Sequence, residues 1–236
     1  MNVDKVIVRP FEGKDRESVR RICRETGLKG DPARLFFEDE EVLPLLYADY
    51  YLDYEPDACF VAETCGRVVG YQIGCLDYRR RRRIMRTRIY PRVVLRILVK
   101  LLTLQYREKE TYRTLWWILT RSWRETLPDP PDGYPAHAHF NMEKDYRGRH
   151  VGRRLNIAFR RYVLSMGVQG MHAIVREAEG KEVLSAFLCR ERGYRIIAMR
   201  RCTVWEKAIG SKWYTRLLIC DAKPLADEEE DEAGLR

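Results

Sequence analysis

Residues 134–142, YPAHAHFNM, run directly into residues 143–155, EKDYRGRHVGRRL, and this stretch decides the fold. The first part alternates as a strand does, and the second is a turn rich in glycine and arginine that opens a helix. Backbone N–H groups at a helix start have no partner within the helix, and the helix dipole is positive there. Gly148 and Gly152 remove side chains where the backbone must come close to a ligand. The stretch therefore predicts a cradle for an anion such as a phosphate or pyrophosphate.

The size and the cysteines of the chain bound its class. Its 236 residues suit one or at most two domains with a proper core. The seven cysteines are odd in number and contain no CxxC pair, which indicates reduced thiols and disfavours a metal site. The N-terminus has no apolar signal region, and the most apolar stretch, residues 93–104, is shorter than the roughly 20 residues of a membrane span. These features predict a cytoplasmic protein that does not enter a membrane.

Positive charge is concentrated in one segment. Residues 78–126 hold fifteen Lys and Arg residues against three acidic ones, in a chain whose net charge is +9. The arginine run 79–83, with tryptophans nearby, is compatible with a nucleic-acid surface. A single charge run is more often a solvated face, and the tryptophans read as packing residues, so nucleic acid is the disfavoured alternative.

The order of expected elements is that of a mixed α/β domain. Strands are expected at 6–10, 58–63, 68–77, 136–142, 171–176, 195–206 and 213–220, and helices at 15–26, 39–51, 91–104, 109–124, 151–165 and 181–192. We therefore predict a single domain over residues 1–224 with a basic helical insertion at 78–133. Residues 225–236 form an acidic tail that we expect to be disordered.

This order, with Arg147-Gly148-Arg149-His150-Val151-Gly152 at its centre, resembles the GNAT acetyltransferases. Their phosphate-binding turn reads Arg or Gln, two residues, Gly, one residue, then Gly or Ala. The hairpin ending in Val69-Gly70-Tyr71 and the late Gly193-Tyr194 support the resemblance, which covers nearly the whole chain. Residues 134–141 and 167–172 more particularly resemble bacterial GNAT proteins related to the C-terminal acetyltransferase-like domain of O-GlcNAcase.

The resemblance implies a central mixed sheet flanked by helices, in which two parallel strands, 136–142 and 171–176, splay apart around acetyl-CoA. The pantetheine would pair with the backbone of the first strand, and the pyrophosphate would meet the N–H groups of the turn. The cofactor-binding residues so implied are Phe140, Asn141, Met142, Arg147, Gly148, Arg149, His150, Val151, Gly152 and Arg153.

Two positions depart from the family pattern. His150 stands where the family has its middle glycine, so its side chain either crowds the pyrophosphate or donates to it. Leu188 stands where the family usually has the tyrosine that protonates the departing thiolate, and leucine has no proton to donate.

Four residues are candidates for proton transfer. His139 and His172 lie on the two strands expected to splay, and histidine titrates near the working pH of amine acetylation. Either one alone is also compatible with a hydrogen-bonded core histidine. Asp77 at a strand end and Glu143 just past the expected acetyl site are further candidates, although a capping or solvated carboxylate is the commoner role.

Taken together, these features predict an N-acetyltransferase that moves the acetyl group of acetyl-CoA to a primary amine by direct attack. The acceptor is expected to be a small molecule or a peptide, and the protein a monomer or homodimer. The alternative is a GNAT-like domain that no longer catalyses and serves as a CoA-binding or interaction module. An enzyme would turn acetyl-CoA over, whereas a degenerate binder would not.

Overall fold

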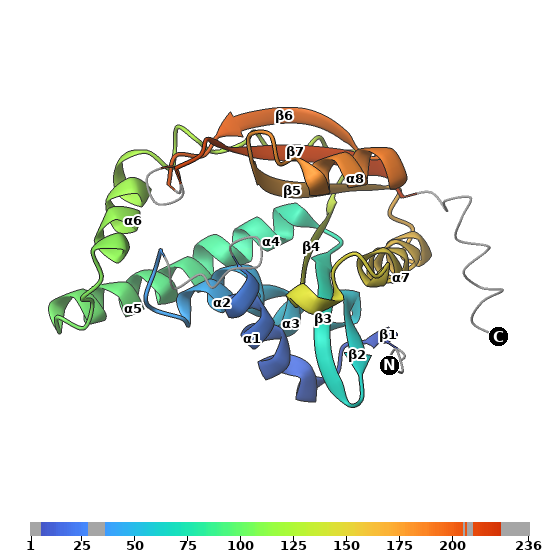
Figure 1. Ribbon diagram of the computed structural model, residues 1–236, viewed down its shortest axis with the longest axis horizontal. Helices are drawn as coiled ribbons and strands as arrows, with labels where there is room; N and C mark the ends of the chain where they lie inside the picture. Colours follow the sequence, from blue (N-terminus) through green and yellow to red (C-terminus); the bar gives the residue numbers. More distant parts are fainter. Residues whose placement is uncertain (1–5, 28–35, 205, 207–209, 223–236) are drawn as a thin grey trace.

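A seven-stranded sheet forms the centre of the molecule (Figure 1). The computed structural model describes residues 6–27, 36–204, 206 and 210–222, so the tail expected at 225–236 lies outside the described residues. The strands are β1 (Ile7–Pro10), β2 (Cys59–Thr64), β3 (Arg67–Cys75), β4 (Ala136–Met142), β5 (Gly170–Ala178), β6 (Arg195–Arg201) and β7 (Trp213–Asp221). Their order is β1-β2-β3-β4-β5-β7-β6, and all neighbours are antiparallel except the parallel pair β4 and β5. The expected mixed α/β fold is confirmed.

Helices cover both faces of the sheet. They are α1 (Arg16–Thr26), α2 (Val42–Tyr47), α3 (Asp49–Tyr54), α4 (Tyr78–Ile84), α5 (Tyr90–Leu102), α6 (Lys109–Thr120), α7 (Val151–Ser165) and α8 (Val183–Glu191). Short helical turns lie at η1 (Gly13–Asp15), η3 (Pro56–Ala58) and η5 (Lys144–Tyr146), and a π-helical segment, η4 (Met85–Ile89), joins α4 to α5.

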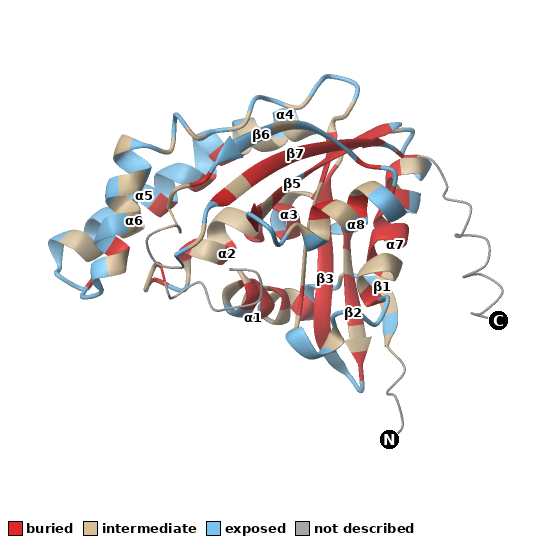
Figure 2. Ribbon diagram, turned by 45° about the horizontal axis from the view of Figure 1, so that its top comes forward, coloured by how far each residue is buried: buried red, intermediate tan, exposed pale blue. Residues whose placement is uncertain are grey.

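Side chains along each strand point alternately to the two faces of the sheet, and each face has its own hydrophobic core. On β2, Cys59 and Val61 join a core with α1 and α3, whereas Phe60 packs on the opposite side with α7. Figure 2 shows β3 and β7 largely buried and much of α5 and α6 exposed. The sheet therefore separates an α1–α4 side from an α7–α8 side.

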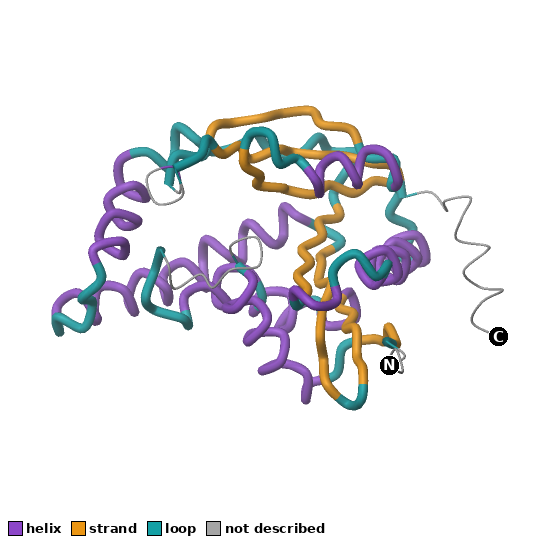
Figure 3. Tube along the Cα trace, in the orientation of Figure 1, coloured by secondary structure: helices purple, strands orange, loops and turns teal. Residues whose placement is uncertain are grey.

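Strands β4 and β5 begin side by side and then separate. Their pairing covers only Ala136 with Met171, His137 with His172, and Ala138 with Ala173. Both strands continue past this point, β4 to Met142 and β5 to Ala178. In Figure 3 the strands β2 to β4 run across the direction of β5 to β7. The splay implied by the family resemblance is thus present, and it begins after Ala138.

The basic insertion forms a long helical run that starts earlier than expected. Asp77 caps α4 by accepting a hydrogen bond from the Arg80 N–H at 3.0 Å, so the helix begins at Tyr78 and not near Pro91. Met85, Ile89 and Val93 recur every four residues and are all buried against the α1–α4 core.

Among the described residues, none of the helices combines the length and apolar character that a membrane span requires.

Helix expectations near the N-terminus need two corrections. The single helix expected over 39–51 is two helices, because the chain breaks at Ala48 between α2 and α3. Asp15 does precede α1, but its carboxylate makes no cap bond to that helix. It binds the Arg9 guanidinium at 2.7 and 2.9 Å, which ties β1 to the start of α1.

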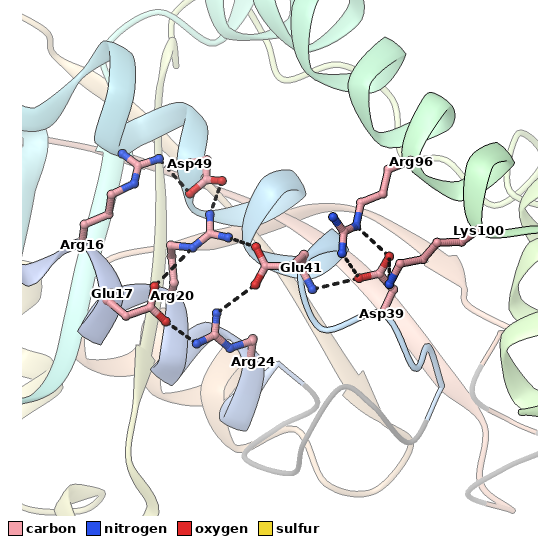
Figure 4. Close-up of polar contacts among 9 residues, drawn as sticks. All are labelled: Arg16, Glu17, Arg20, Arg24, Asp39, Glu41, Asp49, Arg96 and Lys100. Atoms are coloured by element: carbon pink, nitrogen blue, oxygen red, sulfur yellow. Dashed lines mark hydrogen bonds and ion pairs between the residues drawn. The ribbon is translucent and has the colours of Figure 1, made fainter. Parts of the chain in front are cut away.

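Ion pairs fix α1 against its neighbours (Figure 4). Arg20 on α1 binds both Glu41, before α2, and Asp49 on α3. Arg16 adds a contact to Asp49 at 3.2 Å, and Arg24 one to Glu41 at 3.5 Å. Asp49 and Arg20 are both largely shielded from water, which strengthens their attraction, so these contacts hold α1 to α2 and α3.

Candidate active site

The turn between β4 and α7 is exposed and ends on the open N-terminus of a helix. Residues 147–150 are exposed, and α7 begins at Val151 as the sequence predicts. Gly148 adopts φ +74° and His150 φ +59°, both in the left-handed region. The first turn of α7 therefore follows an exposed turn, and its N–H groups, which have no partner within the helix, are the groups that bind anions at such a helix start.

The left-handed backbone at His150 explains why a glycine is common in the family at this point. A residue with a Cβ is strained there by about 1–2 kcal/mol. We expect His150→Gly to raise the free energy of unfolding by about 0.5–1 kcal/mol, because part of the relief is offset by the greater freedom of glycine in the unfolded chain. Urea titration measures this, with His150→Ala as the control that keeps the strain. A loss of stability in His150→Gly would contradict the strain.

The other residues expected to hold the cofactor gather around this turn. Gly152 faces β4, where a methyl group added to it would lie 3.5 Å from the Met142 side chain and 3.9 Å from Phe140. Arg147 donates from Nη2 to the Met142 carbonyl at 2.9 Å, which fastens the turn to the end of β4. The Arg149 guanidinium lies 5.7 Å from the Tyr146 ring centroid. Arg153, in the first turn of α7, is half-buried.

On its other face, β4 presents His137, His139 and Asn141 toward the α1–α4 side. Asn141 donates to the Tyr71 hydroxyl at 2.9 Å. The His139 ring stacks 5.9 Å from the ring of Tyr47, at the end of α2. His139 and Asn141 lie beyond the last residue of β4 that pairs with β5, so they stand at the splay itself.

His137 and His172 are paired across β4 and β5, just before the strands separate. Their ring centroids are 4.9 Å apart, and Tyr78 covers His172 edge-on at 4.6 Å. His172 donates from Nδ1 to the Tyr134 carbonyl at 2.8 Å, and the Tyr51 hydroxyl lies 2.8 Å from His137 Nδ1. Because Nδ1 of His172 carries the proton, its buried Nε2 is an acceptor, and no described residue partners it.

Burial keeps all three histidines neutral. It lowers the pKa of His139 and of His172 to about 4 and that of His137 well below its ordinary value, and the positive charge of Arg81 lowers each further. A hydrogen bond to the Tyr134 carbonyl opposes the shift of the His172 pKa without cancelling it. Each imidazole is therefore uncharged at neutral pH and able to accept a proton or a hydrogen bond.

Solved structures share this arrangement of strands and helices. SsHAT is 27% identical, with a TM-score of 0.67 over 93% of this chain and 100% of that chain. A Drosophila melanogaster polyamine N-acetyltransferase is 16% identical, with a TM-score of 0.54 over 92% of this chain and 100% of the other. The chain has the GNAT acetyltransferase fold. A GNAT phosphinothricin acetyltransferase from Sinorhizobium meliloti, solved with acetyl-CoA, is 15% identical over 92% of this chain and 88% of its own, with a TM-score of 0.51. No model of a known protein family matches the sequence.

Within this GNAT fold, the two carboxylate candidates have structural partners. Asp77 is the exposed N-cap of α4. Glu143 is largely buried and binds Arg21 of α1 at 2.8 Å and Arg67 of β3 at 2.9 Å. These contacts join the end of β4 to α1 and β3, and they leave the histidines as the candidates that stand at or beside the splay.

Leu188 lies in the apolar core between α8 and the sheet. Its side chain is 5% exposed and belongs to the same cluster as Ala173 and Val175 of β5. A leucine at this position fits its surroundings as a packing residue.

Most of the arginine run turns out to be paired. Three of its members bind acids that lie just before η3 or in the loop before β4: Arg79 with Asp132, Arg80 with Glu55, and Arg82 with Asp129. Arg83 is exposed, and Arg81 points inward between tyrosines. The run is therefore the outer face of α4 with one residue directed to the interior.

Sequence reasoning missed several residues of this side of the site. They are Tyr47, Tyr51, Tyr78, Arg81 and Arg176. One signal was readable: Tyr78, Arg81 and Met85 follow the helical spacing of three and four residues, which places them on one face. That spacing would have separated Arg81 from its neighbours in the run.

Proposed function

We propose that this protein is an acetyl-CoA-dependent N-acetyltransferase that acetylates a primary amine by direct attack. The observation that carries the proposal is the splay of β4 from β5 beside the exposed N-terminus of α7. Solved proteins with the same fold, one of them with acetyl-CoA bound, support it. The detailed resemblance of residues 134–141 and 167–172 favours the bacterial group related to the O-GlcNAcase domain.

The described residues fit the cofactor in two places. The edge of β4 beyond Ala138 has lost β5 as its neighbour, so its backbone groups are available to pair with a pantetheine amide, and these belong to His139, Phe140, Asn141 and Met142. The N–H groups of residues 148–152, at the start of α7, would hold the pyrophosphate. Bound there, acetyl-CoA supplies an activated acetyl group at the splay.

The chemistry asked of the protein is mainly positioning and proton removal. Orienting an amine against a thioester makes a bimolecular step effectively unimolecular, and this contributes most of the rate. His139 stands at the splay as a neutral imidazole and accepts the proton of the acceptor ammonium, directly or through a water. A histidine whose pKa is about 4 is a weak base. The same positive, dehydrated surroundings lower the pKa of the amine, so less basicity is needed.

His139→Gln is expected to lower kcat/KM by about a hundredfold, because a positioned base contributes roughly 10²- to 10⁴-fold. Glutamine keeps a polar group beside Asn141, so the affinity for acetyl-CoA should change little. Steady-state kinetics with calorimetry of acetyl-CoA binding separates the two effects. Unchanged kcat/KM in the variant would remove His139 from the chemistry.

The pH profile of the wild type gives a further readout of this prediction. Since burial lowers the pKa of His139 to about 4, the imidazole stays neutral and competent above that pH. The limb that belongs to His139 should therefore lie near pH 4, and any limb above pH 6.5 should follow the pKa of the acceptor amine. A limb at pH 6.5 that disappears in His139→Gln would contradict the lowered pKa.

The proposal as a whole is tested by the release of free CoA from acetyl-CoA in the presence of small amines, aminosugars and lysine peptides. Turnover above background with any of them supports the enzyme. Binding of acetyl-CoA without turnover would favour the alternative, a CoA-binding module. We also infer a cytoplasmic location, on the seven free thiols.

A further inference from the structure

Arg81 is the one member of the arginine run that points into the protein. Its guanidinium carbon lies 5.1 Å from the Tyr51 ring centroid, 5.6 Å from that of Tyr78 and 5.7 Å from that of Tyr50. Tyr50 and Tyr51 are fully buried and Arg81 is half-buried, so the tyrosine rings cover much of the guanidinium. Aromatic faces attract a guanidinium but do not neutralise its charge.

No carboxylate accompanies this cation in the part of the chain that the structure describes. No described residue forms an ion pair with Arg81, and its Nε is buried without a hydrogen-bond partner. Two of the three neighbouring hydroxyls are engaged elsewhere, since Tyr50 donates to Glu55 at 3.1 Å and the Tyr51 hydroxyl contacts His137. A largely covered guanidinium without an anion is costly, so this group calls for an anionic partner beyond the described residues, and a bound ligand can supply one.

A second guanidinium lies on the other side of the splay. Arg176 is on β5, past the last residue that pairs with β4, and donates from Nη1 to the Tyr47 hydroxyl at 3.3 Å. The Tyr47 ring in turn stacks on His139. Arg176 and Arg81 are the two charged groups that act on His139, and each lowers its pKa. Arg81 reaches the same face of β4 through Tyr51, whose hydroxyl lies 2.8 Å from His137 Nδ1, so the two cations flank the histidine-bearing face of this strand.

We propose that Arg81 and Arg176 form an acceptor subsite for a carboxylate, so that the amine substrate is one that carries a carboxylate group. The role of this subsite in holding an acceptor rests on the proposed function, whereas the binding of a carboxylate does not depend on it. Guanidinium groups hold carboxylates through paired, charge-assisted hydrogen bonds. A carboxylate bound here would neutralise the buried charge and bring the amine of the same molecule toward His139 at the splay.

The subsite is tested by binding first, with pairs of probes that differ only in charge. We choose 4-aminobutanoate, 6-aminohexanoate and glutamate, each with the amide of its carboxylates, and titrate them into the protein saturated with CoA. At least one acid is expected to bind ten times or more tighter than its amide. Arg81→Met removes the charge but keeps a long side chain among the tyrosines, and it should remove this preference.

Arg83→Met is the matched control, because Arg83 belongs to the same run and the same helix but is exposed. It should keep the preference for acids. Arg176→Gln should weaken the preference as Arg81→Met does, and it serves if Arg81→Met does not fold. Acids that bind no better than amides to the wild type, or variants at 81 and 176 that both keep the preference, would overturn the subsite.

Turnover then separates this inference from the proposed function. If the acids bind through Arg81 but no acceptor releases CoA, the subsite stands and the acetyltransferase proposal fails. If amines are acetylated equally well as acids and as amides, the enzyme stands and the carboxylate subsite is wrong.

Discussion

We expect Gly152→Asp to abolish the stabilisation that acetyl-CoA should give to the protein. Gly152 lies in the first turn of α7 and faces Phe140 and Met142, so a carboxylate there stands where the pyrophosphate would bind. A ligand at one hundred times its dissociation constant stabilises the folded state by about 2.7 kcal/mol. Repulsion between the new charge and the phosphates should reduce this gain to nearly zero. Urea unfolding with and without acetyl-CoA measures the stability of each protein and the gain that the ligand gives.

Two controls separate charge from shape at this position. Gly152→Ala adds a methyl group at an ordinary contact distance of 3.5 Å from Met142, so the response to acetyl-CoA should persist. Without ligand, Gly152→Asp should be no less stable than Gly152→Ala, because an acid in the first turn of a helix gains about 0.3–1 kcal/mol from the dipole. If Gly152→Asp responds to acetyl-CoA as the wild type does, the phosphates bind elsewhere.

Local chemistry made part of this fold readable. The helix expected over 151–165 has those bounds in the structure, because the glycine-rich turn before it and the Gly167 break after it are encoded in the same stretch. The hairpin of β2 and β3 was readable for the same reason. Its turn residues, Cys65 and Gly66, adopt φ +48° and +75°, as a tight turn between twisted strands requires.

Other parts depend on contacts between distant segments. Residues 39–51 form two helices that meet at Ala48, which is buried in a core that includes residues of α1 far away in the sequence. The meeting of His137 with His172 depends on the register of β4 and β5, which no pattern within either strand specifies. The composition of the arginine run predicted a surface, and only its helical phase shows that Arg81 is turned inward.

Asp39 also depends on contacts between distant segments, because it joins the insertion to the domain. Its side chain is 1% exposed and receives Arg96 at 2.7 Å and Lys100 at 3.0 Å, both from α5 (Figure 4). The Tyr106 hydroxyl adds a hydrogen bond at 3.3 Å. Burial alone would raise the pKa of Asp39, but hydrogen bonds from Arg96 and Lys100 outweigh it and hold the pKa below its ordinary value.

We expect Asp39→Asn to lower the free energy of unfolding by about 2–3 kcal/mol. Removing one partner of a buried ion pair costs about 3–5 kcal/mol, and the partial exposure of Arg96 and Lys100 lets water recover part of this. Arg79→Gln is the control, because its pair with Asp132 is exposed on both sides and should contribute less than about 1 kcal/mol. Urea unfolding at neutral pH measures the two variants.

The dependence of this effect on pH identifies its cause. Because the pKa of Asp39 is lowered in the folded state, its contribution is complete above the ordinary carboxyl pKa of 3.8 and is lost as the pH falls through the lower, folded value. The difference between wild type and Asp39→Asn should therefore be constant from neutral pH to about pH 5 and shrink in stronger acid. A difference that persists unchanged at low pH would assign the loss to packing, and the joined helices η4 and α5 would then be held to the domain mainly by the buried side chains of Met85, Ile89 and Val93.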